Sequence, residues 1–180
     1  MADNILLGPD AQVRFSLQML RALEGRGAIA GGTTPIQDGI FLSCDPESGI
    51  KGEFEASKTN MVSVNIHPSE QGMPRWLGLH IAMGPVDLSN AAVVGIAARS
   101  KAPSSITTRV CLRSGRSGQF MDTFFPKTMV SFAAPSTHLD LLDLSALPDL
   151  PRQAAWRELV LFFRPGEVDL DLLDLRLFVV

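Results

Sequence analysis

From Val62 to the C-terminus the sequence consists of short segments in which apolar and polar residues alternate, separated by clusters of Gly, Pro, Ser and Asn. Alternation with a period of two is typical of strands that bury one face, and regularly spaced turn residues between them are typical of a sandwich or barrel. Seven segments show this pattern: 61–67, 76–83, 93–99, 107–113, 129–133, 158–163 and 172–179. We therefore predict an all-β fold, an antiparallel β-sandwich with little helix.

The first sixty residues have a less uniform pattern. Alternate residues are apolar, as in a strand: Val13, Phe15, Leu17 and Met19. Leu17, Leu20 and Leu23 also share one face of a helix, and periodicity does not separate the two in so short a run; we favour the strand. The glycine-rich run 25–32 has neither the Lys-Ser/Thr of a phosphate-binding loop nor a helix pattern after it. We expect a flexible connection there.

Length and composition limit the classes of protein that remain. With 180 residues, 46% of them hydrophobic, the chain fits one core, and we predict one β-sandwich domain over 1–180, in which 1–50 is the least clearly assigned part. The net charge of -3 lacks the basic surplus of a nucleic-acid binder. No segment approaches the ~20 apolar residues that span a bilayer, and no basic region opens a secretory signal. We expect a cytoplasmic protein without nucleic-acid or membrane partners.

Catalytic and metal-binding signatures are missing from the sequence. His67, His80 and His138 are widely separated, and no Gly-x-Ser-x-Gly is present. Cys44 and Cys111 have no His or Cys at metal-ligand spacing, so we expect two buried free thiols. We predict no catalytic residue, no cofactor and no metal, and we favour a non-catalytic protein.

The alternation also separates the core from the opposite face of each strand. We predict as buried Leu79, Ile81, Val110, Leu112, Leu161, Leu175 and Leu177. On the opposite faces we predict five ligand-binding residues: Trp76, His80, Arg99, Arg113 and Glu158. Sugar hydroxyls pair with arginine and carboxylate groups, and the apolar side of a sugar ring packs on an aromatic ring, so a sheet face that gathers these groups would suit a carbohydrate. The alternative is a solvated face whose charges pair across strands.

Charge is unevenly distributed along the chain. Between Asp87 and Asp122 there is no acid, but there are five bases. Such a stretch could attract an anionic carbohydrate. The alternative is that basic and acidic strands neutralise each other within one sheet.

The second half of the chain resembles a known superfamily. The segments that carry the resemblance are Trp76-Leu-Gly-Leu-His-Ile, Asp87-Leu-Ser, a run ending in Ala98-Arg99-Ser100, Arg109-Val-Cys-Leu-Arg, Trp156-Arg-Glu-Leu-Val-Leu-Phe-Phe and Asp171-Leu-Leu-Asp-Leu-Arg-Leu-Phe. Over about residues 50–180, their order and spacing are similar to those of galactose-binding-like jelly rolls, among them many carbohydrate-binding modules. This resemblance implies a two-sheet β-sandwich of jelly-roll type that binds ligands on a concave face or at the loop ends.

Some members of this superfamily hold a structural calcium ion near the chain termini. Asp169, Asp171 and Asp174 stand in the closing region from which such a carboxylate could come. Carboxylates on one strand make no calcium site without oxygens from elsewhere, so a structural calcium ion stays an open alternative and is not part of the prediction.

Two further hypotheses compete with carbohydrate binding. Val160, Phe162 and Phe178 fall on the non-core side of their strands, where an exposed apolar group would indicate a structural or assembly protein that contacts a protein partner or a second copy of itself. The other is a glycoside hydrolase or lyase whose paired carboxylates come from Glu158 and Asp174.

Overall fold

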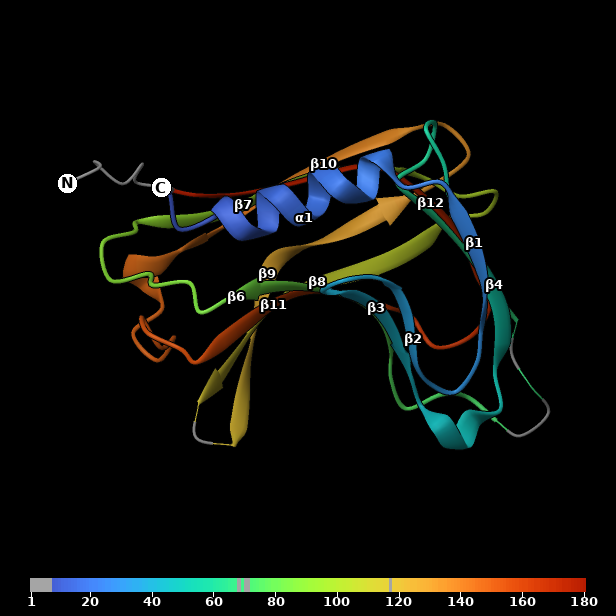
Figure 1. Cartoon of the computed structure of the whole chain (residues 1–180), viewed down its shortest axis with the longest axis horizontal. Coiled ribbons are helices and arrows are strands. Elements are labelled where there is room, and N and C mark those ends of the chain that lie inside the picture. Colours follow the sequence, from blue (N-terminus) through green and yellow to red (C-terminus); the bar gives the residue numbers. More distant parts are fainter. Residues whose placement is uncertain (1–7, 68, 70–71, 117) are drawn as a thin grey trace.

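The computed structural model describes residues 8–67, 69, 72–116 and 118–180. Two antiparallel six-stranded sheets pack face to face (Figure 1). In order across the sheet, sheet A contains β1 (Gly25–Ile29), β4 (Lys51–Ala56), β5 (Val62–His67), β12 (Val168–Val179), β7 (Val93–Lys101) and β10 (Ser136–Asp143). Sheet B contains β2 (Gly32–Gln37), β3 (Ile40–Cys44), β6 (Leu77–Gly84), β11 (Trp156–Phe163), β8 (Ile106–Arg116) and β9 (Gln119–Ser131). The predicted antiparallel sandwich of jelly-roll type is confirmed.

All seven predicted segments overlap strands of the structure. The segment 129–133 covers only the end of β9. The seven residues predicted to form the core are all buried, within a cluster that both sheets contribute. Cys44 and Cys111 are buried free thiols, as expected, and burial raises their pKa to about 11 and about 12.

The strand predicted around Val13 is wrong, because residues Ala11–Ala22 form the helix α1. Its buried residues Val13, Leu17 and Leu20 follow helical spacing and join the core, while α1 contacts β6 of one sheet and β12 of the other. Phe15 and Met19 are exposed, and these two apolar residues produced the apparent alternation. No helix among the described residues is long and apolar enough to cross a membrane.

The flexible connection predicted for 25–32 is also wrong. Gly25–Ile29 is β1, which pairs with β4, and β2 begins at Gly32. A side chain at position 27 would force the Phe54 ring to move, because a Cβ atom there would lie 2.6 Å from it. Gly27 therefore allows the ring of Phe54, its register partner on β4, to pack against β1.

Two short helical turns complete the connections. The 3₁₀ turn η1 (Pro46–Ser48) follows β3, and η2 (Leu144–Ala146) follows β10. Each is capped by an aspartate that precedes it: Asp45 accepts the Glu47 N–H, and Asp143 accepts the Ser145 N–H. η1 therefore follows a strand of sheet B, and η2 follows a strand of sheet A.

Candidate functional site

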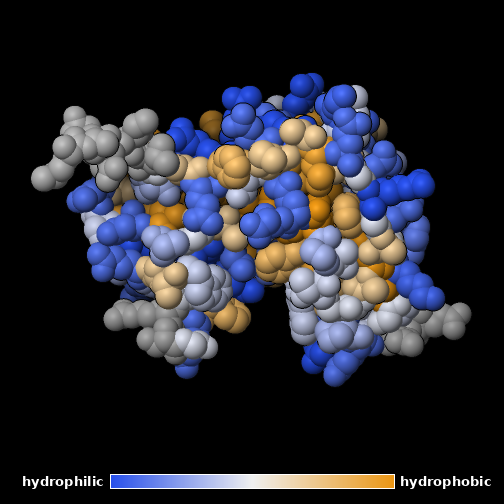
Figure 2. Space-filling view, viewed as in Figure 1, coloured by the Kyte–Doolittle hydropathy of each residue, from blue (hydrophilic) through white to orange (hydrophobic). Residues whose placement is uncertain are grey.

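The outer surface of sheet B lies in a groove. Figure 2 shows the molecular surface hollowed between two lobes, and the same view in Figure 1 places the β8–β9 hairpin in one lobe and β2, β3 and η1 in the other. The strands between them in the sheet order are β6, β11 and β8. Their outward side chains form the floor of this groove.

A histidine and a glutamate pair on the groove floor. His80 on β6 and Glu158 on β11 are joined by a 2.8 Å contact between Nδ1 and Oε2. The His80 ring stacks on Phe41 of β3, with 4.8 Å between ring centroids, and the residue is only 4% exposed. Because three neighbouring strands hold this ring, its orientation is set before any ligand arrives.

An arginine and an aspartate form a second pair beside the first. Arg113 of β8 donates from Nε and Nη2 to the two carboxylate oxygens of Asp122 on β9, at 2.7 and 2.8 Å. This hydrogen bonding raises the pKa of Arg113 above its ordinary value. Glu158, Arg113 and Asp122 are register partners across three adjacent strands, so negative, positive and negative groups alternate in one row.

Aromatic rings lie on both sides of these polar pairs. Phe120 lies 4.0 Å below the Arg113 guanidinium, and the Arg109 guanidinium lies 3.8 Å from the Phe124 ring. Trp156, 39% exposed, covers Gly115, where a Cβ atom would lie 2.0 Å from the indole. Phe120, the register partner of Gly115, is also exposed.

The start of β11, which carries Trp156, is anchored by a buried cation. Arg157 is fully buried and donates to the carbonyl oxygen of Val86 at 2.9 Å and to that of Arg152 at 3.0 Å. It also donates to Ser114 Oγ on β8. Burial lowers the pKa of Arg157 to about 10, and the carbonyl oxygens compensate for its lost hydration.

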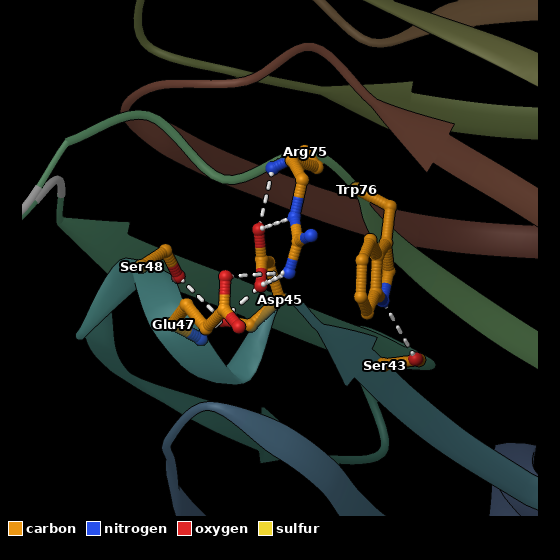
Figure 3. Close-up of polar contacts among 6 residues, drawn as sticks. All are labelled: Ser43, Asp45, Glu47, Ser48, Arg75 and Trp76. Atoms are coloured by element: carbon orange, nitrogen blue, oxygen red, sulfur yellow. Dashed lines mark hydrogen bonds and ion pairs between the residues drawn. The ribbon is translucent and has the colours of Figure 1, made fainter.

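Trp76 lies at the other wall, next to η1 (Figure 3). Its indole Nε1 donates to Ser43 Oγ at 3.3 Å, and its carbonyl oxygen accepts the Asp45 N–H at 3.1 Å. The Arg75 guanidinium lies 5.1 Å from its ring centroid. The Asp45 carboxylate accepts from Arg75, and this bond holds the pKa of Asp45 well below its usual range.

Four of the five residues predicted as ligand-binding belong to this outer face: Trp76, His80, Arg113 and Glu158. The expectation that Arg99 shares it is wrong, because Arg99 lies on β7 of sheet A, opposite Asp174 of β12. Alternation along a strand shows which side chains leave the core, but both sheets have an outer face. The role of the other four in binding stays a prediction.

The division of outward residues between two sheets also argues against the glycoside hydrolase and the assembly hypotheses. Asp174 lies on sheet A, where Arg21 donates to it at 2.9 Å, so it cannot pair with Glu158 across a sugar. Val160 is buried and Phe178 lies on sheet A, so these two and Phe162 form no common exposed patch.

Several groove residues were not predicted from the sequence: Phe41, Phe120, Asp122, Phe124 and Trp156. The sequence held no signal for Phe41, since Ile40, Phe41 and Leu42 are all apolar and their alternating burial is a property of the folded strand. In β9 the alternation is interrupted, because the register shifts between Arg109 and Cys111 of its partner strand. Phe124 therefore could not be assigned to a face from its sequence neighbours.

The described residues include no group of three or more His, Cys, Asp or Glu side chains placed to hold a metal ion. Of the carboxylates considered for calcium, Asp171 lies 3.3 Å from Lys101 Nζ. Asp174 accepts from both Arg21 and Arg176. These two carboxylates are thus occupied by cationic side chains.

No protein-family model and no curated protein sequence matches the chain. Among solved structures, it is similar to a xylan-binding domain, a carbohydrate-binding module from Paenibacillus barcinonensis, at 12% identity and a TM-score of 0.50, covering 87% of this chain and 96% of that one. A tandem of two such domains from the same organism gives 12% identity and a TM-score of 0.53, covering 88% of this chain and 46% of that one.

A third solved structure is the xyloglucanase domain of a type three effector from Sinorhizobium fredii, at 11% identity and a TM-score of 0.51, covering 87% of this chain and 99% of that one. At such low identity these likenesses show the fold alone. The chain has the jelly-roll fold seen in carbohydrate-binding modules.

Proposed function

We propose that this protein is a non-catalytic carbohydrate-binding domain that holds a neutral glycan chain in the groove of sheet B. The observation that carries the proposal is the groove itself, in which two fixed polar pairs lie between exposed aromatic rings. Planar polar side chains match sugar hydroxyls, and aromatic rings match the apolar side of a sugar ring. The jelly-roll fold shared with a xylan-binding domain supports the same function.

The His80–Glu158 pair provides a defined hydrogen-bonding pattern. When the neutral ring donates its Nδ1 proton to Glu158, its Nε2 atom is an acceptor. Among the described residues, no hydrogen-bond partner contacts Nε2 of His80. In the same part of the chain, the buried side-chain atoms without a partner belong to Thr108, His138 and Arg152, so Nε2 of His80 is not one of them. Nε2 is therefore available to accept from a sugar hydroxyl.

The two tryptophans lie far enough apart to suit a chain of sugars. Trp76 precedes β6 and Trp156 begins β11, which runs antiparallel to β6, so the two residues lie at opposite ends of this strand pair. An eight-residue strand such as β6 extends roughly 25 Å at about 3.3 Å per residue. This length is several times that of one sugar ring, which favours an oligosaccharide or polysaccharide over a monosaccharide.

The balance of charge favours a neutral glycan over the anionic one that the basic stretch of the sequence suggested. Arg113 is neutralised by Asp122, and Glu158 lies next to it in the register. Arg99 lies on the other sheet. Arg109 contributes one cation at the groove, stacked on Phe124.

The test is a screen of the purified protein on immobilised neutral polysaccharides (xylan, xyloglucan, mixed-linkage β-glucan) and on anionic polygalacturonate. Isothermal titration then compares Glu158→Gln with Arg99→Ala, a control that removes a charged side chain on the other sheet. We expect Glu158→Gln to weaken binding about fivefold, because a neutral amide accepts a weaker hydrogen bond than a carboxylate. We expect Arg99→Ala to leave affinity unchanged. Binding to none of the polysaccharides, or equal losses in both variants, would contradict the proposal.

A further inference from the structure

We propose that Asp45 and Arg75 are positioning residues that hold Trp76 as a fixed stacking surface at one wall of the groove. The proposal rests on the proposed glycan-binding function and adds a specific device to it. Neither residue needs to touch the ligand. Both act through the orientation of the Trp76 indole, which is 38% exposed.

The Asp45 carboxylate is the fixed point of this arrangement. It is 3% exposed and accepts four hydrogen bonds, from the Glu47 N–H at 3.1 Å, the Arg75 N–H at 3.0 Å and the Arg75 guanidinium at 2.7 and 2.9 Å. A buried carboxylate is costly unless it is paired. Asp45 therefore keeps its side chain in place, and both of its oxygens bind Arg75.

Arg75 transmits this constraint to the tryptophan. Its side chain is 60% exposed, yet Asp45 binds the guanidinium and Glu47 lies 2.9 Å from it. Figure 3 shows the guanidinium between these two carboxylates and the Trp76 indole. A guanidinium beside an indole is attracted by the π system. One side of the ring thus meets a cation that cannot move freely.

Two further contacts, from β3 and from the backbone of Asp45, hold Trp76 in place. Ser43 accepts from the indole N–H, and the Asp45 N–H donates to the Trp76 carbonyl oxygen. The ring is therefore held at one edge, on one side and at its backbone. An exposed side chain held in one rotamer loses little conformational entropy when a ligand stacks on it, and affinity gains accordingly.

Capping of η1 does not by itself explain the arrangement. Asp143 caps η2 in the same way, accepting from the Ser145 N–H at 2.9 Å and from its hydroxyl, and within the described part of the chain it has no arginine partner. The turn η2 is thus capped by an aspartate that accepts no hydrogen bonds from the arginine side chains that the structure describes. The additional contacts of Asp45 all lead to Arg75 and from there to Trp76.

The test uses the Trp156→Phe background, in which Trp76 is the only tryptophan, since the chain has two. Asp45→Asn and Arg75→Gln are compared with Trp76→Ala and with Asp143→Asn, the matched capping control. Fluorescence anisotropy and acrylamide quenching report the mobility of Trp76. Titration with xylohexaose, cellohexaose and any polysaccharide bound in the screen reports affinity.

We expect Asp45→Asn and Arg75→Gln to lower the Trp76 anisotropy and to weaken binding about three- to tenfold, approaching the loss in Trp76→Ala. Asp143→Asn should change neither quantity. Because Arg75 is exposed, Arg75→Gln keeps the test valid if Asp45→Asn does not fold. Unchanged anisotropy and affinity in the folded variants would overturn the proposal. Absence of all glycan binding by the wild type would instead refute the proposed function, while the anisotropy would still decide whether Asp45 and Arg75 immobilise Trp76.

Discussion

Single glycines determine where aromatic rings lie against each sheet. On sheet B, the indole of Trp156 occupies the space that a side chain at Gly115 would need. On sheet A, the ring of Phe178 covers Gly95 in the same way, again 2.0 Å from where a Cβ atom would stand. The two positions have the same local geometry, but only Gly115 belongs to the groove.

Gly115→Ala should therefore displace Trp156, and Gly95→Ala should displace only Phe178. Overpacking costs about 1–3 kcal/mol at such sites, unless the ring swings away from the sheet. In a Trp76→Phe background, Gly115→Ala should shift the emission of Trp156 and weaken binding of the glycan found in the screen. Gly95→Ala should leave both unchanged. An identical response of the two variants would mean that Trp156 takes no part in the groove.

The ion pair of Asp45 gives a second prediction for a single residue. Arg75 lowers the pKa of Asp45 below the ordinary value of 3.8, so the folded state binds the proton less well than the unfolded state. The pair therefore contributes its full stability above about pH 4 and loses it as the pH falls further. In urea unfolding, the difference in free energy between wild type and Asp45→Asn should stay constant from about pH 8 to pH 5 and shrink below about pH 4. A difference that grows on acidification would contradict this assignment.

At the level of elements, regular alternation made most strands after Val62 predictable. β10 escaped prediction because its pattern is reversed: Asp140 is buried, whereas Leu139 and Leu141 are exposed. Asp140 accepts the Lys127 N–H at 2.7 Å, so this polar side chain joins the edge strands β9 and β10 of the two sheets. Which face of β10 is buried depends on this contact between the two sheets, and the sequence of β10 alone does not predict that contact.

β10 also carries a histidine whose titration should affect stability. Burial lowers the pKa of His138; Asp140, 3.9 Å away, opposes this shift and Lys127 adds to it. The unfolded state therefore takes up the proton first as the pH falls below about 6.5, and stability decreases. His138→Asn should reduce the loss of stability between about pH 7.5 and pH 5.5, as measured by urea midpoints. An unchanged loss would show that another group causes it.

For the whole molecule, the strand order decides which outward residues meet. β6 and β8 belong to sheet B, but β7, between them in sequence, belongs to sheet A, as the crossing connections of a jelly roll require. Arg113 and Arg99 therefore point away from the core on opposite sides of the molecule. Sequence reasoning could identify the outward residues of each strand but could not distribute them between the sheets, because that depends on pairing of distant segments.

The charges in the groove determine how glycan affinity should depend on salt concentration. In the groove, Arg113 lies between Asp122 and Glu158 in the strand register. Salt screens the two short hydrogen bonds from Arg113 to Asp122 less than it screens well-separated surface charges. A neutral glycan has no net charge, so its affinity should change less than twofold between about 50 mM and about 500 mM NaCl. An anionic polygalacturonate would instead depend on Arg109 and lose affinity steeply over the same range, because screening weakens exposed charge pairs. Titration of both ligands at the two salt concentrations distinguishes these cases. If only polygalacturonate binds, tightly and with strong salt dependence, the ligand is an anionic glycan and the proposal of a neutral one is wrong.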